Sequence, residues 1–280
     1  KTKEVFIKKF FITRIDEQDD TINNEIKFYE KFSSKTYYPK FIPSYYGYCI
    51  EKSLIGQKTY HLIFKHYSYS LRDIIKENSL SGDFSTIKNY FYQLVRSIAH
   101  LQCHNISQRD IKPENILLDE SKKQLFLTDY GICMKYKKDD HKAYQFMGTN
   151  EYRSPEWVET CSKKKYIQDI DPFKSDSFSL GLVVLEMGGI KINKKKENYQ
   201  EYILELNSKI DEFFDKYKNE IGANEENTRF GQHLKDMLFE KPADRLDCFE
   251  IFFKNFGFLD NNKIIYHIYI EDHTYEELYW

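Results

Sequence analysis

Three short stretches of the sequence carry side chains that could act on a negatively charged substrate. They are Arg109-Asp110-Ile111-Lys112-Pro113-Glu114-Asn115, then Asp129-Tyr130-Gly131, then Ser154-Pro155-Glu156. Carboxylate and amide oxygens, such as those of Asn115 and Asp129, are the ligands that Mg²⁺ prefers. A lysine such as Lys112 stabilises negative charge that develops nearby. One stretch alone could be a solvated acidic turn, but three in a fixed order favour a site for a metal-bound anion.

In order and spacing, these stretches resemble the catalytic loop, the DFG motif and the APE motif of the protein kinase family. The resemblance extends from Lys8 to about Phe256 and so covers nearly the whole chain. It implies an α+β bilobal fold, with a small β-rich N-lobe and a larger, mostly helical C-lobe. It also implies transfer of the γ-phosphoryl group of ATP to a protein substrate. Lys112 matches the serine/threonine kinase pattern rather than the tyrosine kinase pattern.

The resemblance assigns roles to the charged residues of the first two stretches. Asp110 is expected to accept or orient the proton of the substrate hydroxyl, and Lys112 to stabilise the transferring phosphate. Asn115 and Asp129 are expected to bind Mg²⁺, which bridges the phosphates of ATP. Phosphoryl transfer depends mainly on positioning and charge neutralisation, so these residue types fit the reaction.

The resemblance also places the ATP site. Lys8 resembles the strand lysine that holds the α- and β-phosphates, and Glu25 resembles the helix glutamate that pairs with it. On their own, these two would be ordinary surface residues. The residues expected around the nucleoside are Phe64 as the gatekeeper behind the adenine, Lys65, His66 and Tyr67 as the hinge, Leu117 as the floor, and Ser70 or Asp73 beside the ribose.

Two further resemblances concern stability rather than chemistry. Asp176 resembles the buried aspartate that braces the catalytic loop of the family. Arg245 resembles the arginine that pairs with the glutamate of the APE motif, here Glu156. Removing one partner of such a buried pair is expected to cost about 3–5 kcal/mol of stability.

Four features depart from the family pattern. None of the 11 glycines falls in a GxGxxG spacing. The two strands that cover the phosphates in the family are therefore expected to be upstream of this chain, poorly ordered or missing, and a truncated chain is the favoured reading. Phe6 stands where the family has an alanine, and strand alternation places it on the same face as Lys8, toward the adenine. Gln108 replaces the histidine of the family's His-Arg-Asp motif. Tyr130 replaces the phenylalanine of the DFG motif.

The segment from residue 129 to residue 156 predicts how activity is controlled. Arg109 directly precedes the catalytic aspartate, an arrangement that lets a phosphate order this segment in many family members. Between residues 132 and 148, the only hydroxyl groups belong to Tyr136 and Tyr144. We therefore expect no serine or threonine phosphorylation there, with a carboxylate of Asp139–Asp140 in place of the phosphate. Thr149 is expected to hold the substrate-binding loop.

Other functions are open at the level of sequence. A pseudokinase, a kinase-shaped binding or structural subunit without phosphoryl transfer, is favoured by Phe6, by Gln108 and by the missing glycine-rich loop. The retained charged catalytic residues favour the enzyme. A nucleic-acid binder has only the lysine runs 163–165 and 194–196 in its favour, and such short runs are usually solvated loops. The pair His100 and His104 could bind a metal, but no third ligand lies near them in the sequence.

Composition and charge limit the expected partners. The net charge is −2, so no overall field favours nucleic acid or an anionic membrane. No apolar run approaches the ~20 residues of a membrane span, and the first residues show no signal-peptide pattern. The five cysteines are widely spaced and form no CxxC pair. That usage fits a reducing compartment, so a cytoplasmic location is expected.

The periodicity of apolar residues divides the chain into unequal parts. Residues 1–67 are predicted to be a partial N-lobe with the hinge, with strands at 4–12, 44–50 and 59–65 and a helix at 21–32. Residues 68–256 are predicted to be the C-lobe, with helices at 70–77, 84–104, 178–187 and 247–253 and strands at 116–118 and 124–128. Residues 257–280 form a C-terminal extension. This tail and a polar helical insertion at 193–228 are the expected contact surfaces for an assembly partner.

Overall fold

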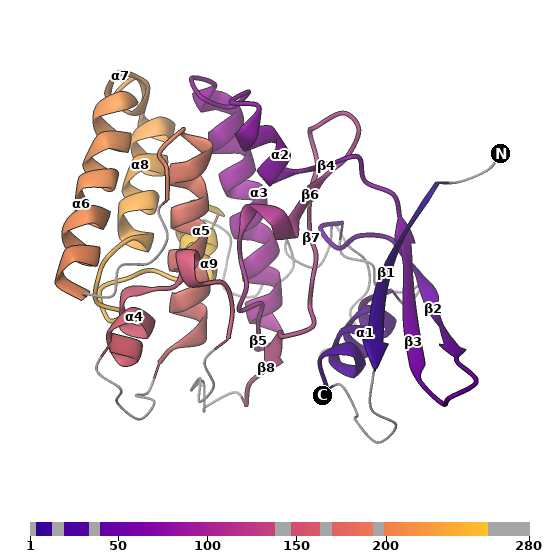
Figure 1. The fold of residues 1–280 in the computed structure, drawn as a ribbon. Helices are drawn as coiled ribbons and strands as arrows, with labels where there is room; N and C mark the ends of the chain where they lie inside the picture. The colour runs from indigo at the N-terminus through magenta and orange to yellow at the C-terminus, as the bar shows by residue number, and fades with distance from the viewer. Residues whose placement is uncertain are drawn as a thin grey trace.

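A small antiparallel sheet with one helix stands beside a larger helical body (Figure 1). The computed structural model describes residues 4–12, 20–33, 40–137, 147–162, 170–192 and 199–256. The C-terminal extension, both lysine runs, Tyr144 and Asp139–Asp140 lie outside the described residues, so the predictions that concern them are not addressed by the structure.

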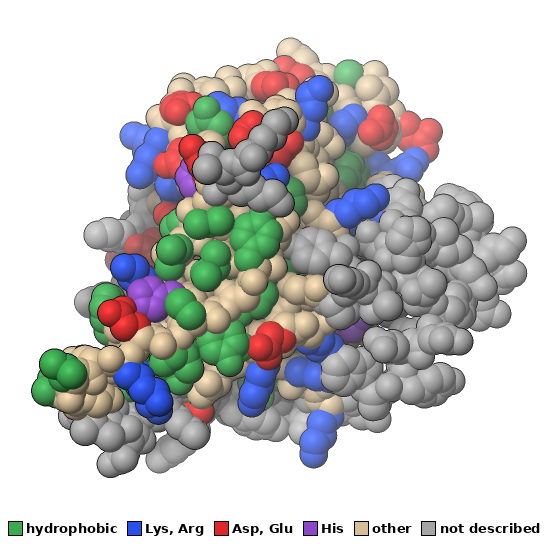
Figure 2. Space-filling view, turned by 90° about the vertical axis from the view of Figure 1, so that its right-hand side faces the viewer, with side chains coloured by type: hydrophobic (Ala, Val, Ile, Leu, Met, Phe, Trp, Pro, Cys, Tyr) green, Lys and Arg blue, Asp and Glu red, His purple; other side chains and the backbone are tan. Residues whose placement is uncertain are grey.

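The sheet of the N-lobe contains three antiparallel strands in the order β1-β3-β2. They are β1 (Val5–Ile12), β2 (Tyr45–Lys52) and β3 (Lys58–Lys65). In β1 the side chains of Lys8, Phe10 and Ile12 are partly buried while Lys9 and Phe11 are exposed, as alternation requires. The outward face of the sheet displays several apolar side chains (Figure 2).

Helix α1 (Asp20–Phe32) packs on the inward face of this sheet. Its buried stripe includes Ile22, Ile26 and Tyr29, which recur at helical spacing. The ring of Tyr29 lies 4.8 Å from that of Phe64 on β3. Glu25 lies on the same buried stripe, so the packing of α1 fixes where its carboxylate points.

The C-lobe is mainly helical. Its helices are α2 (Leu71–Lys76), α3 (Phe84–Cys103), α4 (Pro155–Ser162), α5 (Pro172–Met187), α6 (Tyr199–Lys216), α7 (Lys218–Ile221), α8 (Glu225–Met237) and α9 (Cys248–Phe256). Its short strands are β4 (Tyr69–Ser70), β5 (Ile106–Ser107), β6 (Ile116–Leu118), β7 (Leu125–Leu127) and β8 (Met134–Lys135). The predicted elements are present, with ends that differ from prediction by a few residues.

Helix α5 forms the centre of the C-lobe, and nearly all of its residues are buried. The sequence predicted its start at residue 178, but the helix begins at Pro172. Asp171 explains the earlier start, because its carboxylate accepts hydrogen bonds from the N–H groups of Phe173 and Lys174. A proline directly after such a cap is a typical helix start.

The segment predicted to be a polar insertion contributes to the core of the C-lobe. Leu206, Phe213 and Tyr217 are buried there. Gly188 at the end of α5 lies so close to α6 that an added Cβ would come within 2.4 Å of the Phe213 ring. The role of this segment as a contact surface for a partner stays a prediction. Among the helices in the described ranges, none is both long and apolar enough to cross a bilayer.

Candidate active site

Asp176 of α5 holds the predicted catalytic loop in place. The Asp176 carboxylate accepts hydrogen bonds from the N–H groups of Gln108 (2.8 Å) and Arg109 (2.9 Å) and from the hydroxyl of Ser107 (2.8 Å). Burial raises the pKa of Asp176 to about 6, although the three donors act in the opposite direction. Arg109 has a left-handed φ of 70°, a strained conformation that these bonds help to hold. Asp176 therefore lies where the resemblance places it.

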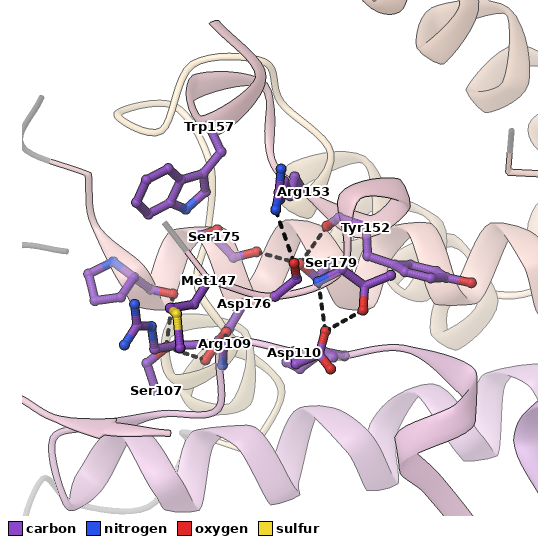
Figure 3. A pocket seen from close by; sticks show the side chains of 14 residues that line it. Ser107, Arg109, Asp110, Met147, Tyr152, Arg153, Trp157, Ser175, Asp176 and Ser179 are labelled. Atoms are coloured by element: carbon purple, nitrogen blue, oxygen red, sulfur yellow. Dashed lines mark hydrogen bonds between the residues drawn. The ribbon is translucent and has the colours of Figure 1, made fainter. Parts of the chain in front are cut away.

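The carboxylate of Asp110, which is labelled in Figure 3, contacts polar groups of its own loop and of the segment that carries Thr149. It accepts hydrogen bonds from the N–H (2.8 Å) and hydroxyl (2.6 Å) of Thr149 and from the amide nitrogen of Asn115 (3.0 Å). The Lys112 ammonium lies 2.6 Å from Asp110 and donates to the Thr149 hydroxyl at 2.7 Å. The two predicted catalytic side chains are thus brought together, and Thr149 connects them.

Thr149 was assigned by sequence only to the substrate-binding loop, so its contact with both predicted catalytic side chains was missed. Gly148 makes this contact possible. An added Cβ at Gly148 would lie 2.3 Å from the carbonyl oxygen of Arg109, and its φ is 88°. Only glycine tolerates that conformation and that approach. The Gly148-Thr149 pair in the sequence is the signal that could have identified the contact.

Gln108 connects the catalytic loop to the predicted metal-binding stretch. Its side chain is fully buried. The side-chain oxygen accepts from the N–H of Asp110 at 2.7 Å, and the side-chain nitrogen donates to the carbonyls of Thr128 and Asp129, each at 3.3 Å. An amide has both a donor and an acceptor, so glutamine satisfies both sides at once. The departure from the family histidine therefore leaves the two segments joined.

The predicted metal ligands Asn115 and Asp129 are brought close by the pairing of β6 with β7. Ile116 pairs with Leu127, and the N–H of Thr128 donates to the carbonyl of Asn115 at 3.0 Å. The Asn115 nitrogen faces Asp110, so its oxygen is the atom left for a cation. The Asp129 carboxylate is 41% exposed. An amide oxygen and an open carboxylate are a donor set that fits Mg²⁺.

Lys8 joins the N-lobe to the predicted metal-binding stretch. Its ammonium lies 2.8–2.9 Å from both oxygens of Glu25 and 2.8 Å from Oδ1 of Asp129. Burial alone would lower the pKa of Lys8, but the two carboxylates outweigh it and the pKa is raised. Burial raises the pKa of Glu25 to about 7 against the opposing effect of Lys8. The three predicted charges therefore meet at one point, although residues 8 and 129 are distant in sequence.

Asn24 is a second residue that the sequence reasoning missed. Its side-chain nitrogen donates to the carbonyls of Tyr130 (3.3 Å), Gly131 (3.0 Å) and Cys133 (2.8 Å). Tyr130 is buried, and its ring stacks on that of Phe28 at 3.7 Å. Helix α1 thus contacts the metal-binding stretch through Asn24 as well as through Glu25. The position of Asn24 beside Glu25 is the available sequence signal.

The residues predicted around the adenine include Phe64 on β3 and Leu117 on β6. Phe64 is buried at the end of β3, between Tyr29 and Tyr45. Leu117 on β6 is partly exposed, while its neighbours Ile116 and Leu118 are buried on the opposite side. The partly exposed face of Leu117 is the one that a base could contact. Both placements agree with a gatekeeper and a floor, and the assignments themselves stay predictions.

The hinge residues follow directly after β3. The N–H of Lys65 donates to the carbonyl of Ser44 at 2.9 Å, and the Tyr67 hydroxyl accepts from the N–H of Ser44 at 3.1 Å. The N–H of His66 donates to the carbonyl of Glu4 at 3.4 Å. These contacts fix the course of the chain between the lobes. They do not test whether Lys65, His66 or Tyr67 contacts a nucleotide, so that assignment stays a prediction.

Two residue pairs that were singled out in the sequence make local contacts at helix ends. Ser70 and Asp73, the candidates for the ribose, hydrogen-bond each other as the capping box of α2. His104 Nδ1 lies 3.0 Å from the carbonyl of His100 at the end of α3. Within the described part of the chain, no cluster of three or more His, Cys, Asp or Glu side chains is arranged to hold a metal ion.

Phe6 lies on the same face of β1 as Lys8, opposite Phe64 on β3. Its side chain is 52% exposed, so the ring is not part of the buried core. The aromatic ring that the Lys8 ammonium contacts is that of Phe10, at 4.9 Å. Whether Phe6 competes with adenine stays a prediction.

Glu156 and Arg245 form the expected buried ion pair. The guanidinium nitrogens lie 2.8 and 2.9 Å from the two carboxylate oxygens. The same guanidinium donates to the carbonyls of Phe239, Lys174 and Glu240. All five N–H groups of Arg245 therefore have an acceptor. The pair fixes α4, and with it the end of the segment that carries Thr149.

The chain is similar in sequence to proteins of one known family. The family model described as Protein kinase domain matches residues 1–256. The probable serine/threonine-protein kinase glkA of Dictyostelium discoideum is 35% identical over 132 residues, 47% of this chain and 26% of that protein. Ribosomal protein S6 kinase alpha-6 of Danio rerio is 40% identical over 101 residues, 36% of this chain and 12% of that protein. The chain thus spans about a quarter or less of these relatives' length.

A solved structure supports the architecture. A chain of the yeast RNA Pol II CTD kinase CTDK-1 complex superposes with a TM-score of 0.66 at 18% identity, over 88% of this chain and 83% of that one. At this level of identity the likeness concerns the fold. The predicted α+β bilobal fold is therefore confirmed.

Proposed function

Because the chain belongs to the protein kinase domain family, we propose that it is an ATP- and Mg²⁺-dependent protein serine/threonine kinase. The observation that carries the proposal is the meeting of Lys8, Glu25 and Asp129 within 2.9 Å. The Lys8 ammonium and the Asp129 carboxylate are both partly exposed, so a phosphate oxygen and a phosphate-bound cation could reach them. The protein substrate and the location, which we expect to be cytoplasmic, belong to the same proposal.

The proposed reaction uses the side chains around Asp110. The substrate hydroxyl oxygen attacks the γ-phosphorus, the bond from that phosphorus to the bridging oxygen of ADP breaks, and Asp110 takes the hydroxyl proton. Lys112 stabilises the charge on the phosphoryl oxygens. Thr149 holds both side chains in position through its hydroxyl. Mg²⁺, held by Asn115 and Asp129, would neutralise phosphate charge when bound.

The experiment combines binding with transfer. ATP with Mg²⁺ is expected to stabilise the protein by about 2.7 kcal/mol at a hundredfold excess over Kd. The Lys8→Met variant should lose most of this shift, because the phosphates lose their cation. Asp110→Asn should keep the shift but abolish phosphate transfer to a generic protein substrate. Transfer that survives in Asp110→Asn would disprove the assigned role.

A pseudokinase is the second candidate, and the position of Phe6 on the Lys8 face favours it. A phenyl ring there would reduce the room for adenine. If so, millimolar ATP should give no thermal shift in the natural protein and a clear shift in Phe6→Ala. A shift in the natural protein that Phe6→Ala leaves unchanged would exclude this alternative.

A further inference from the structure

The turn that joins β2 to β3 displays two aliphatic side chains to solvent. Leu54 is 108% exposed and Ile55 70%. The turn is closed by its own hydrogen bonds, from the N–H of Ser53 to the carbonyl of Gln57 (2.9 Å) and from the N–H of Gly56 to the carbonyl of Ser53 (3.0 Å). Turns favour Gly, Asn, Asp and Ser at such positions. The backbone therefore does not require two adjacent aliphatic residues here.

The apolar surface continues from the turn onto the sheet. Phe11 is 73% exposed, and it pairs with Thr59 of β3 at the same end of the sheet as the turn. Val5 and Ile7 lie on the same face of β1 as Phe11 and are also exposed. Figure 2 shows apolar side chains gathered on this side of the molecule. Exposed apolar patches of this kind mark sites of contact with a protein or a membrane.

Lysine side chains flank the turn. Lys52 ends β2 and Lys58 begins β3, and the two lie directly opposite each other and are exposed. Like charges opposite one another on neighbouring strands are destabilising, so the fold alone does not favour this pair. Lys9 is exposed on β1, whereas the nearby Glu51 lies 3.2 Å from His61. The charge around the turn is therefore positive, although the net charge of the chain is −2. We call this surface the hairpin patch; it consists of Lys9, Phe11, Lys52, Leu54, Ile55 and Lys58.

The shape and charge of the hairpin patch limit what can bind to it. Leu54 and Ile55 project from the end of a hairpin, whereas sites for small ligands are concave. A second copy bound through the same patch would bring Lys52 and Lys58 against the identical lysines. The interface of an anionic bilayer has no fixed shape, and it attracts surfaces that combine Leu or Phe with Lys. Both properties of the patch favour a lipid surface.

We propose that the hairpin patch docks on an anionic lipid surface, with Leu54 and Ile55 inserted between the headgroups and the acyl chains. The ammonium groups of Lys52 and Lys58 then lie at the level of the lipid phosphates, while their aliphatic stems lie against apolar groups. The turn is at the opposite end of β3 from the hinge, so the docked surface does not include the hinge. The inference does not depend on the proposed kinase function, because lipid binding is measured without ATP.

The first test measures binding to lipid vesicles. The natural protein is floated with vesicles of phosphatidylcholine and phosphatidylserine in equal parts, and with vesicles of phosphatidylcholine alone. Binding to the anionic vesicles should be tighter by about tenfold or more, because each lysine near the surface contributes about fivefold. It should weaken as the salt concentration rises. Equal binding to both kinds of vesicle, or no binding to either, would overturn the proposal.

A variant of the turn shows whether the aliphatic side chains insert. Leu54→Ser/Ile55→Ser should bind anionic vesicles more weakly by about tenfold or more, because two apolar side chains are lost from the interface. Its Tm should equal that of the natural protein, since both side chains are exposed. Leu204→Ser is the matched control, because Leu204 on α6 is 71% exposed. A folded Leu54→Ser/Ile55→Ser protein that binds as tightly as the control would overturn the proposal.

A second variant tests the lysines. Lys52→Gln/Lys58→Gln should lose most of the preference for anionic vesicles, about tenfold or more. Lys218→Gln/Lys241→Gln removes two exposed charges of the C-lobe and should keep the preference. Equal losses in the two double variants would mean that any positive charge suffices, and would overturn the proposal.

The last test shows what covers the turn when no lipid is present. Leu54→Trp places an indole there, and the natural protein supplies the background emission of Trp157 and Trp280. The added indole should emit as a solvated tryptophan and shift to shorter wavelength when anionic vesicles are added. Short-wavelength emission before the addition would mean that residues 257–280 or a second copy cover the turn. Dependence of that emission on protein concentration identifies the second copy, and either result would overturn the proposal.

Discussion

Gln108 shows at the residue scale how one amide can join two functional segments. It accepts from the N–H of Asp110 and donates to the carbonyls of Thr128 and Asp129. Sequence alone identified this position only as a departure from the family histidine. The departure could not be evaluated from sequence, because the partners of Gln108 depend on the pairing of β6 with β7.

The Gln108 bonds can be tested by substitution. Gln108→Leu leaves the N–H of Asp110 and the carbonyls it bridged without partners, so the free energy of unfolding should fall by about 1–3 kcal/mol. Gln108→His keeps a polar ring in the same place and should lose less than half of that. Urea denaturation of both variants measures the difference. A Gln108→Leu protein as stable as the natural one would show that these bonds contribute nothing.

Glu25 predicts a pH dependence of stability. Its pKa is about 7 in the folded protein because of burial, against 4.5 in an unfolded chain. Between these values the folded state binds more protons, so this group makes the free energy of unfolding rise as the pH falls from 7 toward 4.5. The slope is at most about 1.4 kcal/mol per pH unit.

Comparison with Glu25→Gln isolates this contribution, because glutamine does not titrate. The difference in free energy of unfolding, natural protein minus variant, should decrease as the pH rises from 4.5 to about 7 and then become constant. Chemical denaturation at several pH values gives the difference. A difference that does not change with pH would mean that Lys8 keeps Glu25 charged throughout.

At the element scale, side chains that contact several distant elements determine how these elements are arranged. Arg245 donates to Glu156 of α4 and to the carbonyl of Lys174 in α5, and its guanidinium lies 4.8 Å from the ring of Phe178. One side chain thereby fixes two helices and the loop before α9. The end of the Thr149 segment depends on it.

Arg245→Lys should therefore be strongly destabilising, although it keeps the charge. Lysine has three donors in place of five and cannot form the bidentate pair with Glu156. A loss of about 3–5 kcal/mol in the free energy of unfolding is expected. Arg229→Lys, at an exposed pair on α8, should change it by less than about 0.5 kcal/mol. Equal effects of the two changes would contradict the assigned role of Arg245.

At the scale of the whole molecule, sequence predicted most of the elements and the charged residues of the site. Motif residues such as Asp110 and Asp129 are recognisable because their chemistry requires those types at that spacing. Asn24 was not recognised, because its partners lie outside its own helix and the contacts are not periodic. Helix α5 was predicted to start too late because its cap, Asp171, lies outside the apolar pattern. Local patterns predict elements, and only packing fixes side-chain partners.

The contact between the two lobes is a property of the whole molecule that can be tested directly. Asn24 in the N-lobe donates to three carbonyls between residues 130 and 133. Asn24→Ala removes all three bonds, so amides of residues 131–135 should exchange hydrogen faster and the ATP-induced stabilisation should decrease. Loss of these bonds should also cost about 1–3 kcal/mol. Asn89→Ala, on the exposed face of α3, is the control. Unchanged exchange at 131–135 in Asn24→Ala would show that the Asn24 bonds do not couple the lobes.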